Sequence, residues 1–224
     1  MCEISGSGDH PSEAFVWLRH LPVNKLTIKR LTMPRQILVP VAHGCEEIEA
    51  VTIIDTLRRA GAQVTIAACT TDHSLEIEAS RGIRFIADCH IEHCTENNYH
   101  LIALPGGMPG SAHLRDCQPL TELLARQQAA GRWYAAICAA SAVVLAHHSL
   151  LDNVRATCYP SFFDQLEGAL AQPGDPVVVD AKKKVITAQG PGCAMAFSLA
   201  LIDAVYGKDA YRPIAKQMLA DWAL

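Results

Sequence analysis

Short apolar runs alternate with segments of helical periodicity along most of the chain. The strand-length apolar runs are residues 36–41, 63–68 and 100–104 and the run that leads into Cys138. Between them, residues 46–60 and 120–130 carry apolar side chains at every third or fourth position, which is the spacing of a helix with one buried face. Alternating strands and helices of this kind predict a mostly parallel sheet covered by helices on both faces.

The same alternation continues to the C-terminus. We predict a hairpin at residues 75–79 and 83–87, strands at 177–180 and 184–188, a helix at 194–206 and a short amphipathic helix from Ala210. The chain contains no internal repeat, low-complexity tract or interdomain linker. The pattern therefore predicts one α/β domain, residues 33–224, with a three-layer α/β/α architecture.

The first 32 residues differ from the rest of the chain. They mix Gly, Ser, His and Pro with one short apolar patch, which is too brief for the core of a signal peptide. Met33 then opens the first predicted strand. We interpret residues 1–32 as an N-terminal extension outside the fold, either disordered or absent from the native protein, and the alternative is an arm docked onto the domain.

Composition narrows the class of protein. Half of the 224 residues are hydrophobic, 19% are charged and the net charge is −4, so nothing favours nucleic acid or an anionic membrane as a partner. The nine cysteines are odd in number and include no Cys-x-x-Cys pair, which is typical of a reducing compartment. No apolar stretch approaches the roughly 18 residues of a membrane span. We expect a cytoplasmic protein.

Cys138 lies where a strand-like run turns into a helix-like one. A side chain on such a turn projects out of the sheet, and the helix N-terminus behind it favours a thiolate. The turn is cramped, and the residues two before and two after Cys138 are the small Ala136 and Ala140. This spacing predicts a nucleophile elbow, and the alternative is a buried structural cysteine at the end of a strand.

Two other segments are expected to meet Cys138 beyond the carboxyl ends of the strands. Gly106 and Gly107 end a buried strand, and their backbone amides, together with the amide of Ala139, are predicted to form an oxyanion hole. Glu49 lies in the first predicted helix between apolar neighbours, so burial is expected to raise its pKa and let it donate a hydrogen bond to the sulfur. Glu46 and Glu47 are assigned to the helix dipole.

The histidines and the Cys89–Cys94 segment are weaker candidates for a catalytic base and a metal site. His147 and His148 follow Cys138 on the same predicted helix. Nine residues separate His147 from Cys138, which is about 13 Å along the helix axis, so both histidines are too far away to act as a base for the thiol. His43 remains a weak candidate base. The run from Cys89 to Cys94 contains two Cys and two His, but one short segment rarely surrounds a tetrahedral metal, so no metal site is predicted.

The motifs around these residues resemble those of the ThiJ/PfpI superfamily, in the branch of the Parkinson-disease-associated protein deglycase and the bacterial protein YajL. The matching segments are residues 44–49 (GCEEIE), 58–61 (RRAG), 80–82 (SRG), 104–110 (LPGGMPG), 135–139 (AAICA) and 189–192 (QGPG). They occur in the family's order across nearly the whole predicted domain. The resemblance implies a flavodoxin-like sandwich, related to glutamine-amidotransferase domains, that forms a homodimer.

The resemblance also implies roles for individual residues. Cys138 corresponds to the family's reactive, oxidisable cysteine and Glu49 to the protonated glutamate beside it, with Gly107 and Ala139 as backbone donors. The substrate-side or dimer-side residues it implies are Arg59, Arg81, Tyr159 and Pro191. Tyr159 stands where the deglycase branch often has a histidine, and a phenol titrates near 10, which argues against efficient glyoxalase chemistry. Cys158 is a neighbouring second thiol, and Ala139 replaces the histidine of the protease branch, so peptidase activity is not expected.

Two functions follow from the resemblance. The first is a cofactor-independent deglycase or glyoxalase that uses Cys138 against methylglyoxal, glyoxal and their early adducts on proteins and nucleotides. The second is a redox-sensing chaperone, without significant turnover, in which peroxide oxidises Cys138 to a sulfinate and the protein holds unfolded clients.

Overall fold

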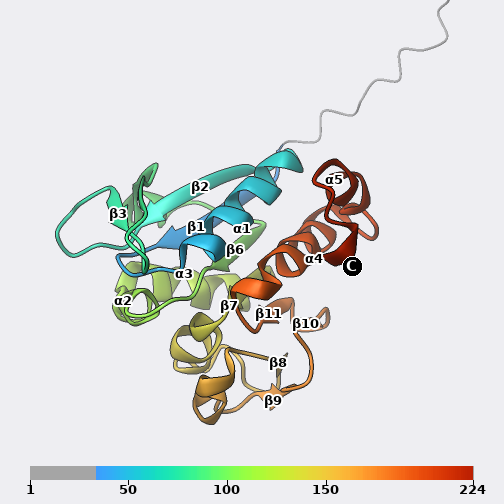
Figure 1. Cartoon of the computed structure of the whole chain (residues 1–224). Helices are drawn as coiled ribbons and strands as arrows, with labels where there is room; N and C mark the ends of the chain where they lie inside the picture. Colours follow the sequence, from blue (N-terminus) through green and yellow to red (C-terminus); the bar gives the residue numbers. More distant parts are fainter. Residues whose placement is uncertain (1–33, 224) are drawn as a thin grey trace, which may run out of the picture. The chain divides into compact units, whose positions relative to one another are not determined.

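A mostly parallel seven-stranded sheet forms the centre of the described part of the chain (Figure 1). The computed structural model describes residues 34–223, and the predicted extension at residues 1–32 lies outside them. The strand order is β10-β11-β7-β6-β1-β2-β5, and every neighbouring pair is parallel except β10 with β11. The strands are β1 (Gln36–Val41), β2 (Gln63–Ala68), β5 (Cys89–His90), β6 (Leu101–Leu104), β7 (Trp133–Ile137), β10 (Val177–Asp180) and β11 (Val185–Ala188).

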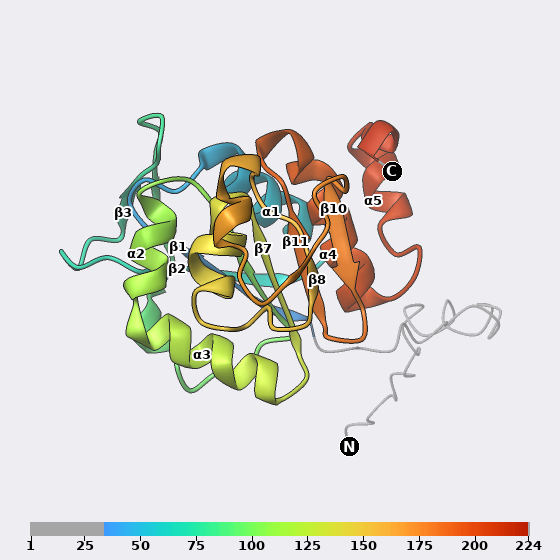
Figure 2. The ribbon, with the colours of Figure 1, turned by 90° about the horizontal axis from the view of Figure 1, so that it is seen from below.

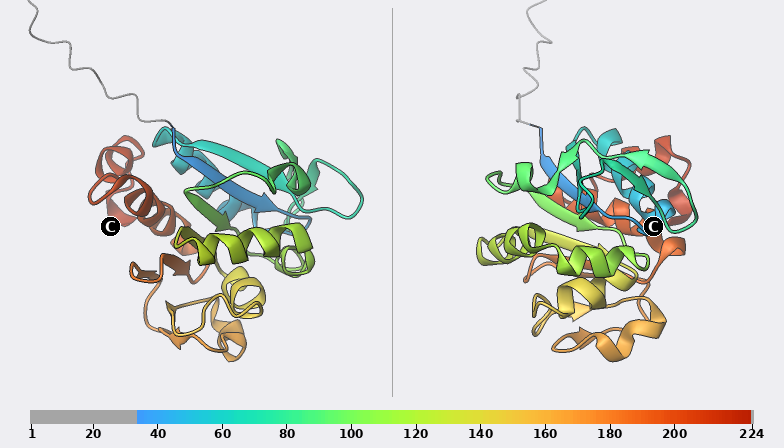
Figure 3. Two further views of the ribbon diagram at one scale, coloured as in Figure 1. Left: turned by 180° about the vertical axis from the view of Figure 1, so that it is seen from behind. Right: turned by 90° about the vertical axis from the view of Figure 1, so that its left-hand side faces the viewer.

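Helices cover both faces of this sheet, which confirms the three-layer prediction. Helices α1 (Glu47–Arg59) and α4 (Ala194–Tyr206) pack against each other on one face. Helices α2 (Gly110–Asp116) and α3 (Gln118–Ala129) and the π-helix η4 (Ser141–Ala146) cover the other face (Figures 2 and 3). The short α5 (Arg212–Gln217) follows α4 near the C-terminus. None of the helices between residues 34 and 223 is long and apolar enough to cross a membrane.

Two hydrophobic cores lie on opposite faces of the sheet. Strand side chains alternate between them, so that Ile37 and Val39 belong to the α1–α4 side while Leu38 belongs to the α2–α3 side. Helix α1 begins where the Glu46 carboxylate accepts the Glu49 amide at 2.8 Å. In β1, β2 and α4 the apolar pattern of the sequence agrees with the side chains that the core buries. These three elements therefore have the bounds that the sequence indicated.

The predicted hairpin is present as β3 (Glu76–Glu78) and β4 (Arg84–Ile86). It is fixed to the loop before α1 by backbone hydrogen bonds from Gly44 to Glu78 and from Ser80 to Cys45, both 2.8 Å. The hairpin therefore stands beside the start of α1. The sequence did not predict α2 or the short elements β5, β8 (Arg155–Ala156), β9 (Leu170–Ala171), η3 (Ile91–Cys94), η5 (Pro160–Gln165), η6 (Pro191–Cys193) and η7 (Asp221–Ala223).

Candidate active site

Cys138 occupies the sharp junction between β7 and the helix that becomes η4. Its φ is +63°, in the left-handed region, and its amide donates to the Ala188 carbonyl at 2.8 Å. Chain direction thus changes at this one residue, directly beyond the carboxyl end of a central strand. The Cys138 side chain is 8% exposed, so it lies at the edge of the core and is still reached by solvent. This is the geometry of a nucleophile elbow.

Gly106 allows three segments to meet at the thiol. A Cβ on Gly106 would lie 2.6 Å from the Cys138 Cβ and 3.0 Å from Glu49 Oε2. Such distances are shorter than van der Waals contact, so any side chain at position 106 would push Cys138 and Glu49 apart. The glycine is therefore required for the pair to approach each other.

Glu49 is fully buried beside Cys138. Its Oε2 accepts the Gly106 amide at 2.7 Å, and its Oε1 is buried without a conventional hydrogen-bond partner. Burial raises the pKa of the Glu49 carboxyl from 4.5 to about 7, and the nearby Glu46 contributes in the same direction, against hydrogen bonds from Gly106 and the Cys138 thiol. The predicted raised pKa is thus present, and Glu49 carries its proton for part of the time near neutral pH.

The Cys138 thiol behaves differently from the sequence prediction of a pKa lowered by the helix N-terminus. Burial and then the charge of Glu49 raise the pKa of Cys138 from 9.0 to about 12, although the amides of Ala139 and Gly107 act in the opposite direction. The helix terminus is outweighed because the thiol is desolvated and faces a carboxylate. The thiol therefore keeps its proton at neutral pH, and Glu49 is the first of the two groups to ionise.

The three predicted backbone donors have two separate roles. The Gly106 amide already donates to Glu49, so it positions that carboxyl and is not free for a substrate oxygen. The amides of Gly107 and Ala139 act on the Cys138 sulfur. Gly107 has φ +89°, and a Cβ there would lie 2.4 Å from the Glu46 amide nitrogen, so its conformation and its close approach both require glycine.

Tyr159 connects the segment after β11 to Cys138. The Tyr159 amide donates to the Cys138 carbonyl at 3.3 Å, and its side chain is 43% exposed. Its ring lies against Gly190, where a Cβ would be 3.2 Å away, which brings Tyr159 near the residue that precedes Pro191. Cys158 is fully buried, whereas Cys138 is 8% exposed, so the Cys158 thiol is the less accessible of the two.

Arg81 lies at the hairpin turn beside the start of α1, whereas Arg59 lies at the opposite end of that helix. The Arg81 amide and the Ser80 hydroxyl both donate to the Glu47 carboxylate at 2.8 Å, which connects the hairpin turn to the start of α1. Glu47 thus has a positioning role beyond its assigned dipole role. Arg59 pairs with Asp55 at 2.7 Å at the far end of α1, about 15 Å along the helix from Glu49. Its place beside a partner's site stays a prediction.

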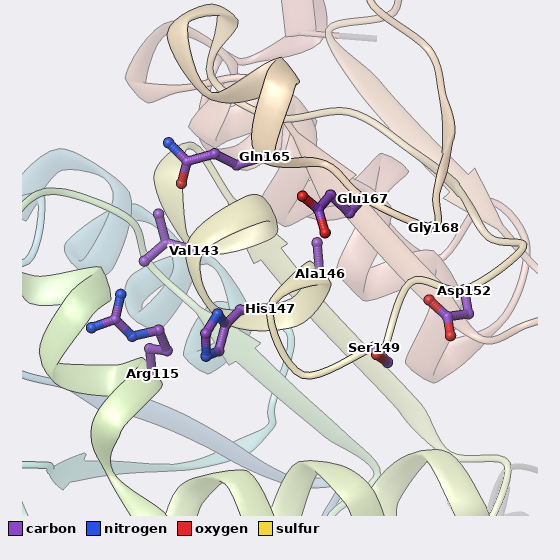
Figure 4. Close-up of a pocket in the computed structure, with 9 residues that line it drawn as sticks. All are labelled: Arg115, Val143, Ala146, His147, Ser149, Asp152, Gln165, Glu167 and Gly168. Atoms are coloured by element: carbon purple, nitrogen blue, oxygen red, sulfur yellow. The ribbon is translucent and has the colours of Figure 1, made fainter.

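The histidines considered as bases have contacts elsewhere. His148 Nε2 lies 2.9 Å from the Arg115 carbonyl, and His43 contacts the Glu78 amide at 3.2 Å and Asp72 at 3.5 Å. His147 lines a cavity of about 390 Å³ together with Arg115 and residues after η5 (Figure 4), and Cys138 is not among the residues that line it. Among the described residues, the groups that act on the Cys138 thiol are therefore Glu49 and backbone amides.

The Cys89–Cys94 segment does not converge as a metal site. The two sulfurs lie 3.6 Å apart, and the rings of His90 and His93 meet edge to face at 6.3 Å. Across residues 34–223, no group of three or more Cys, His, Asp or Glu side chains is arranged to hold a metal ion.

These features define an α/β sandwich protein with a single elbow thiol that is paired with a buried glutamate and two backbone amides. The model of the DJ-1/PfpI family matches residues 35–204. The chain therefore belongs to the DJ-1/PfpI family, as the sequence motifs predicted.

Individual relatives agree with this assignment. Protein DJ-1 homolog B of Arabidopsis thaliana is 39% identical over 175 residues, which are 78% of this chain and 39% of the relative, so the chain spans about two fifths of that protein. The glutathione-independent glyoxalase DJR-1.2 of Caenorhabditis elegans is 32% identical over 81% of this chain and 94% of its own length. The structure of oxidized Toxoplasma gondii DJ-1 matches with a TM-score of 0.79 and 44% identity, covering 84% of this chain and 99% of that one.

Proposed function

We propose that this protein is a cysteine-dependent enzyme that acts on methylglyoxal, glyoxal and their early adducts, as a glyoxalase or deglycase. The observation that carries the proposal is the position of the Cys138 thiol beside the buried Glu49 carboxyl, whose pKa of about 7 allows it to accept and release protons at neutral pH. The glyoxalase name of the Caenorhabditis elegans relative supports the same substrate class.

The geometry suggests how the reaction proceeds without a cofactor. Glu49 takes the proton of the thiol, and the Cys138 sulfur attacks the aldehyde carbon of methylglyoxal to give a hemithioacetal. The amides of Gly107 and Ala139, released from the sulfur, stabilise the oxygen that gains negative charge. Glu49 passes the thiol proton to this oxygen. It then moves a proton from the former aldehyde carbon to the neighbouring carbonyl carbon, while the hydroxyl proton passes to the carbonyl oxygen, which gives a lactoyl thioester. Water hydrolyses this thioester, so that methylglyoxal and one water yield lactate and the free thiol.

The proposal includes a homodimer in the cytoplasm. Large apolar side chains are exposed on α1 (Ile48 57%, Val51 52%) and on the adjoining hairpin (Ile83 55%, Ile86 70%), and a second copy of the chain would cover them. This surface lies beside Arg81, so the partner would border the site and bring its own Arg59 near it. All eight cysteines in the described residues are free thiols, which suits a reducing compartment.

Turnover by matched variants tests the enzyme proposal. Lactate formation from methylglyoxal, and release of a glycated cysteine model, are measured for the wild type, Cys138→Ala and Glu49→Gln. Cys158→Ala serves as the control, because it removes a buried neighbouring thiol that has no role in the mechanism. We expect Cys138→Ala and Glu49→Gln to lose turnover. We expect Cys158→Ala to keep the turnover of the wild type. Equal lactate release from the wild type and Cys138→Ala would refute the proposal.

A redox-sensing chaperone is the second candidate. It is supported by the oxidized state of the Toxoplasma gondii relative and by the two amides at the Cys138 sulfur, which would bind the oxygens of a sulfinate. Two molecules of peroxide would be reduced to water as the thiolate becomes the sulfinate. Suppression of client aggregation that peroxide leaves unchanged would count against this candidate.

A further inference from the structure

A second cavity contains two thiols that the mechanism above does not use. It has a volume of about 510 Å³ and lies where the end of β2, the 3-10 helix η3 and the start of α3 meet. Cys69 follows β2 directly and Cys117 precedes α3 directly, and both line the cavity. Cys69 belongs to the core on the α2–α3 face, whereas Cys138 belongs to the core on the α1–α4 face. The two thiol sites are therefore on opposite sides of the sheet.

Cys117 is placed as an attacking thiolate. It is the N-terminal cap residue of the twelve-residue helix α3, and its carbonyl accepts the amides of Leu120 and Thr121 at 3.1 Å. Hydrogen bonding from the Cys69 side chain lowers the pKa of Cys117 below its usual 9.0 in spite of burial, and the Leu120 amide acts in the same direction. Cys117 is also only partly buried, so a small reagent in the cavity can reach its sulfur.

Cys69 is placed as the second thiol of a pair. It is 6% exposed, and its hydrogen bond to Cys117, together with burial, raises its pKa well above 9.0. The two thiols thus differ in exposure and acidity: the outer Cys117 is the more exposed and the more acidic, and the inner Cys69 is the more buried and the less acidic. This is the division of work in a dithiol that first attacks a disulfide and then resolves it.

The lining of the cavity indicates the kind of molecule that it accepts. Beside the two thiols, the imidazoles of His43, His73 and His113 and the carboxylates of Glu92 and Asp116 face the same space. Groups of both kinds suit a small thiol compound that carries carboxylate and ammonium groups, such as glutathione. The volume is in the range of small-ligand sites.

We propose that Cys117 and Cys69 form a second reactive site, which exchanges electrons with small disulfides such as glutathione disulfide. The Cys117 thiolate attacks one sulfur of the disulfide, and the first glutathione leaves as a thiolate. Cys69 gives up its proton and attacks the Cys117 sulfur of this mixed disulfide, and the second glutathione leaves. The protein dithiol loses two electrons as a Cys69–Cys117 disulfide forms, and the small disulfide gains them as two thiols.

Peptide mapping of the full chain tests this site directly. The reduced protein is exposed to glutathione disulfide, its remaining thiols are blocked, and tryptic peptides are analysed by mass spectrometry without reduction. Cys69 and Cys117 fall in the peptides 60–81 and 116–126, so their disulfide appears as a cross-link between these two peptides. Cys89 and Cys94 share the peptide 85–115, so a disulfide between them appears instead as a loss of two hydrogens within that peptide.

Each variant has a distinct expected result. Cys69→Ser should hold one glutathione on Cys117, Cys117→Ser should show neither the adduct nor the cross-link, and Cys138→Ala should form the cross-link at the wild-type rate. The last variant separates this inference from the function proposed for Cys138. The inference is overturned if the wild type forms no cross-link, or if only Cys138 or the peptide 85–115 is modified.

Discussion

Burial of Glu49 has a consequence for stability that can be measured without a substrate. The folded protein holds the Glu49 proton up to about pH 7, whereas the unfolded chain releases it near 4.5, so between these values the folded state binds more protons. The stability of the wild type must then fall as the pH rises through this window. The difference between 4.5 and about 7, at about 1.4 kcal/mol per unit, gives about 3 kcal/mol.

Glu49→Gln removes this dependence, because glutamine does not ionise and its side-chain oxygen can still accept the Gly106 amide. Urea unfolding of both proteins, near pH 4.5 and above pH 7, gives the two free energies. We expect the stability of the variant relative to the wild type to rise by about 3 kcal/mol between these conditions. Other titrating groups are shared and cancel in the comparison.

Glu47→Gln is the matched control, two residues earlier on the same helix. Burial of Glu47 raises its pKa, but its own amide, the Ser80 hydroxyl and the Arg81 amide outweigh burial, so the net pKa is lowered from 4.5. Its carboxylate therefore stabilises the fold above that pH, and the variant should lose stability there. Parallel curves for the wild type and Glu49→Gln across the window would refute the assignment of a raised pKa to Glu49.

Three further predictions concern a glycine in the loop beside the site, a buried glutamine and the exposed face of α1. In urea unfolding, Gly107→Ala should destabilise the fold by about 2–5 kcal/mol, and it should also slow alkylation of Cys138. Gly61→Ala is the control, because Gly61 has a similar φ but open space around it, and it should lose about 1–2 kcal/mol. Gln127→Leu should lose about 2–4 kcal/mol by thermal or urea unfolding, because the Gln127 amide satisfies two buried carbonyls, and an unchanged midpoint would contradict this. Val51→Glu should give a monomer by light scattering if α1 forms the dimer interface, whereas Leu219→Glu, at an exposed position outside α1, should not.

The regular elements were predictable where a single local signal was sufficient. Strands β1 and β2 are short apolar runs at the centre of the sheet, and α1 and α4 end close to Gly61 and Gly207, which have positive φ. Helix α2 was missed because it is short, begins at Gly110 beside a proline, and is separated from α3 by one residue. In the sequence, the residues of α2 therefore resemble a loop, and only those of α3 show the pattern of a helix.

The motifs named Cys138, Glu49 and the glycines that the fold brings together, but they did not predict the electrostatics of these residues. The sequence shows that Cys138 precedes a helix, which favours a thiolate, yet it does not show how deeply the sulfur is buried or that a carboxylate faces it. Both depend on contacts between segments distant in the chain, such as the one from Gly106 to Glu49. The sequence likewise does not show that Cys69 and Cys117 line one cavity, because only the fold brings the two segments together.

The left-handed conformation of Cys138 affects the stability, and therefore the cellular abundance, of variants at this position. A side chain in that conformation destabilises the chain by roughly 1–2 kcal/mol relative to glycine, so the reactive residue stands at a place where it weakens the fold. Cys138→Gly should therefore fold at least as well as the wild type. Since quality control removes proteins according to their unfolded fraction, such an inactive form would accumulate at normal abundance. Loss of activity at this position would then be invisible to any assay of protein level.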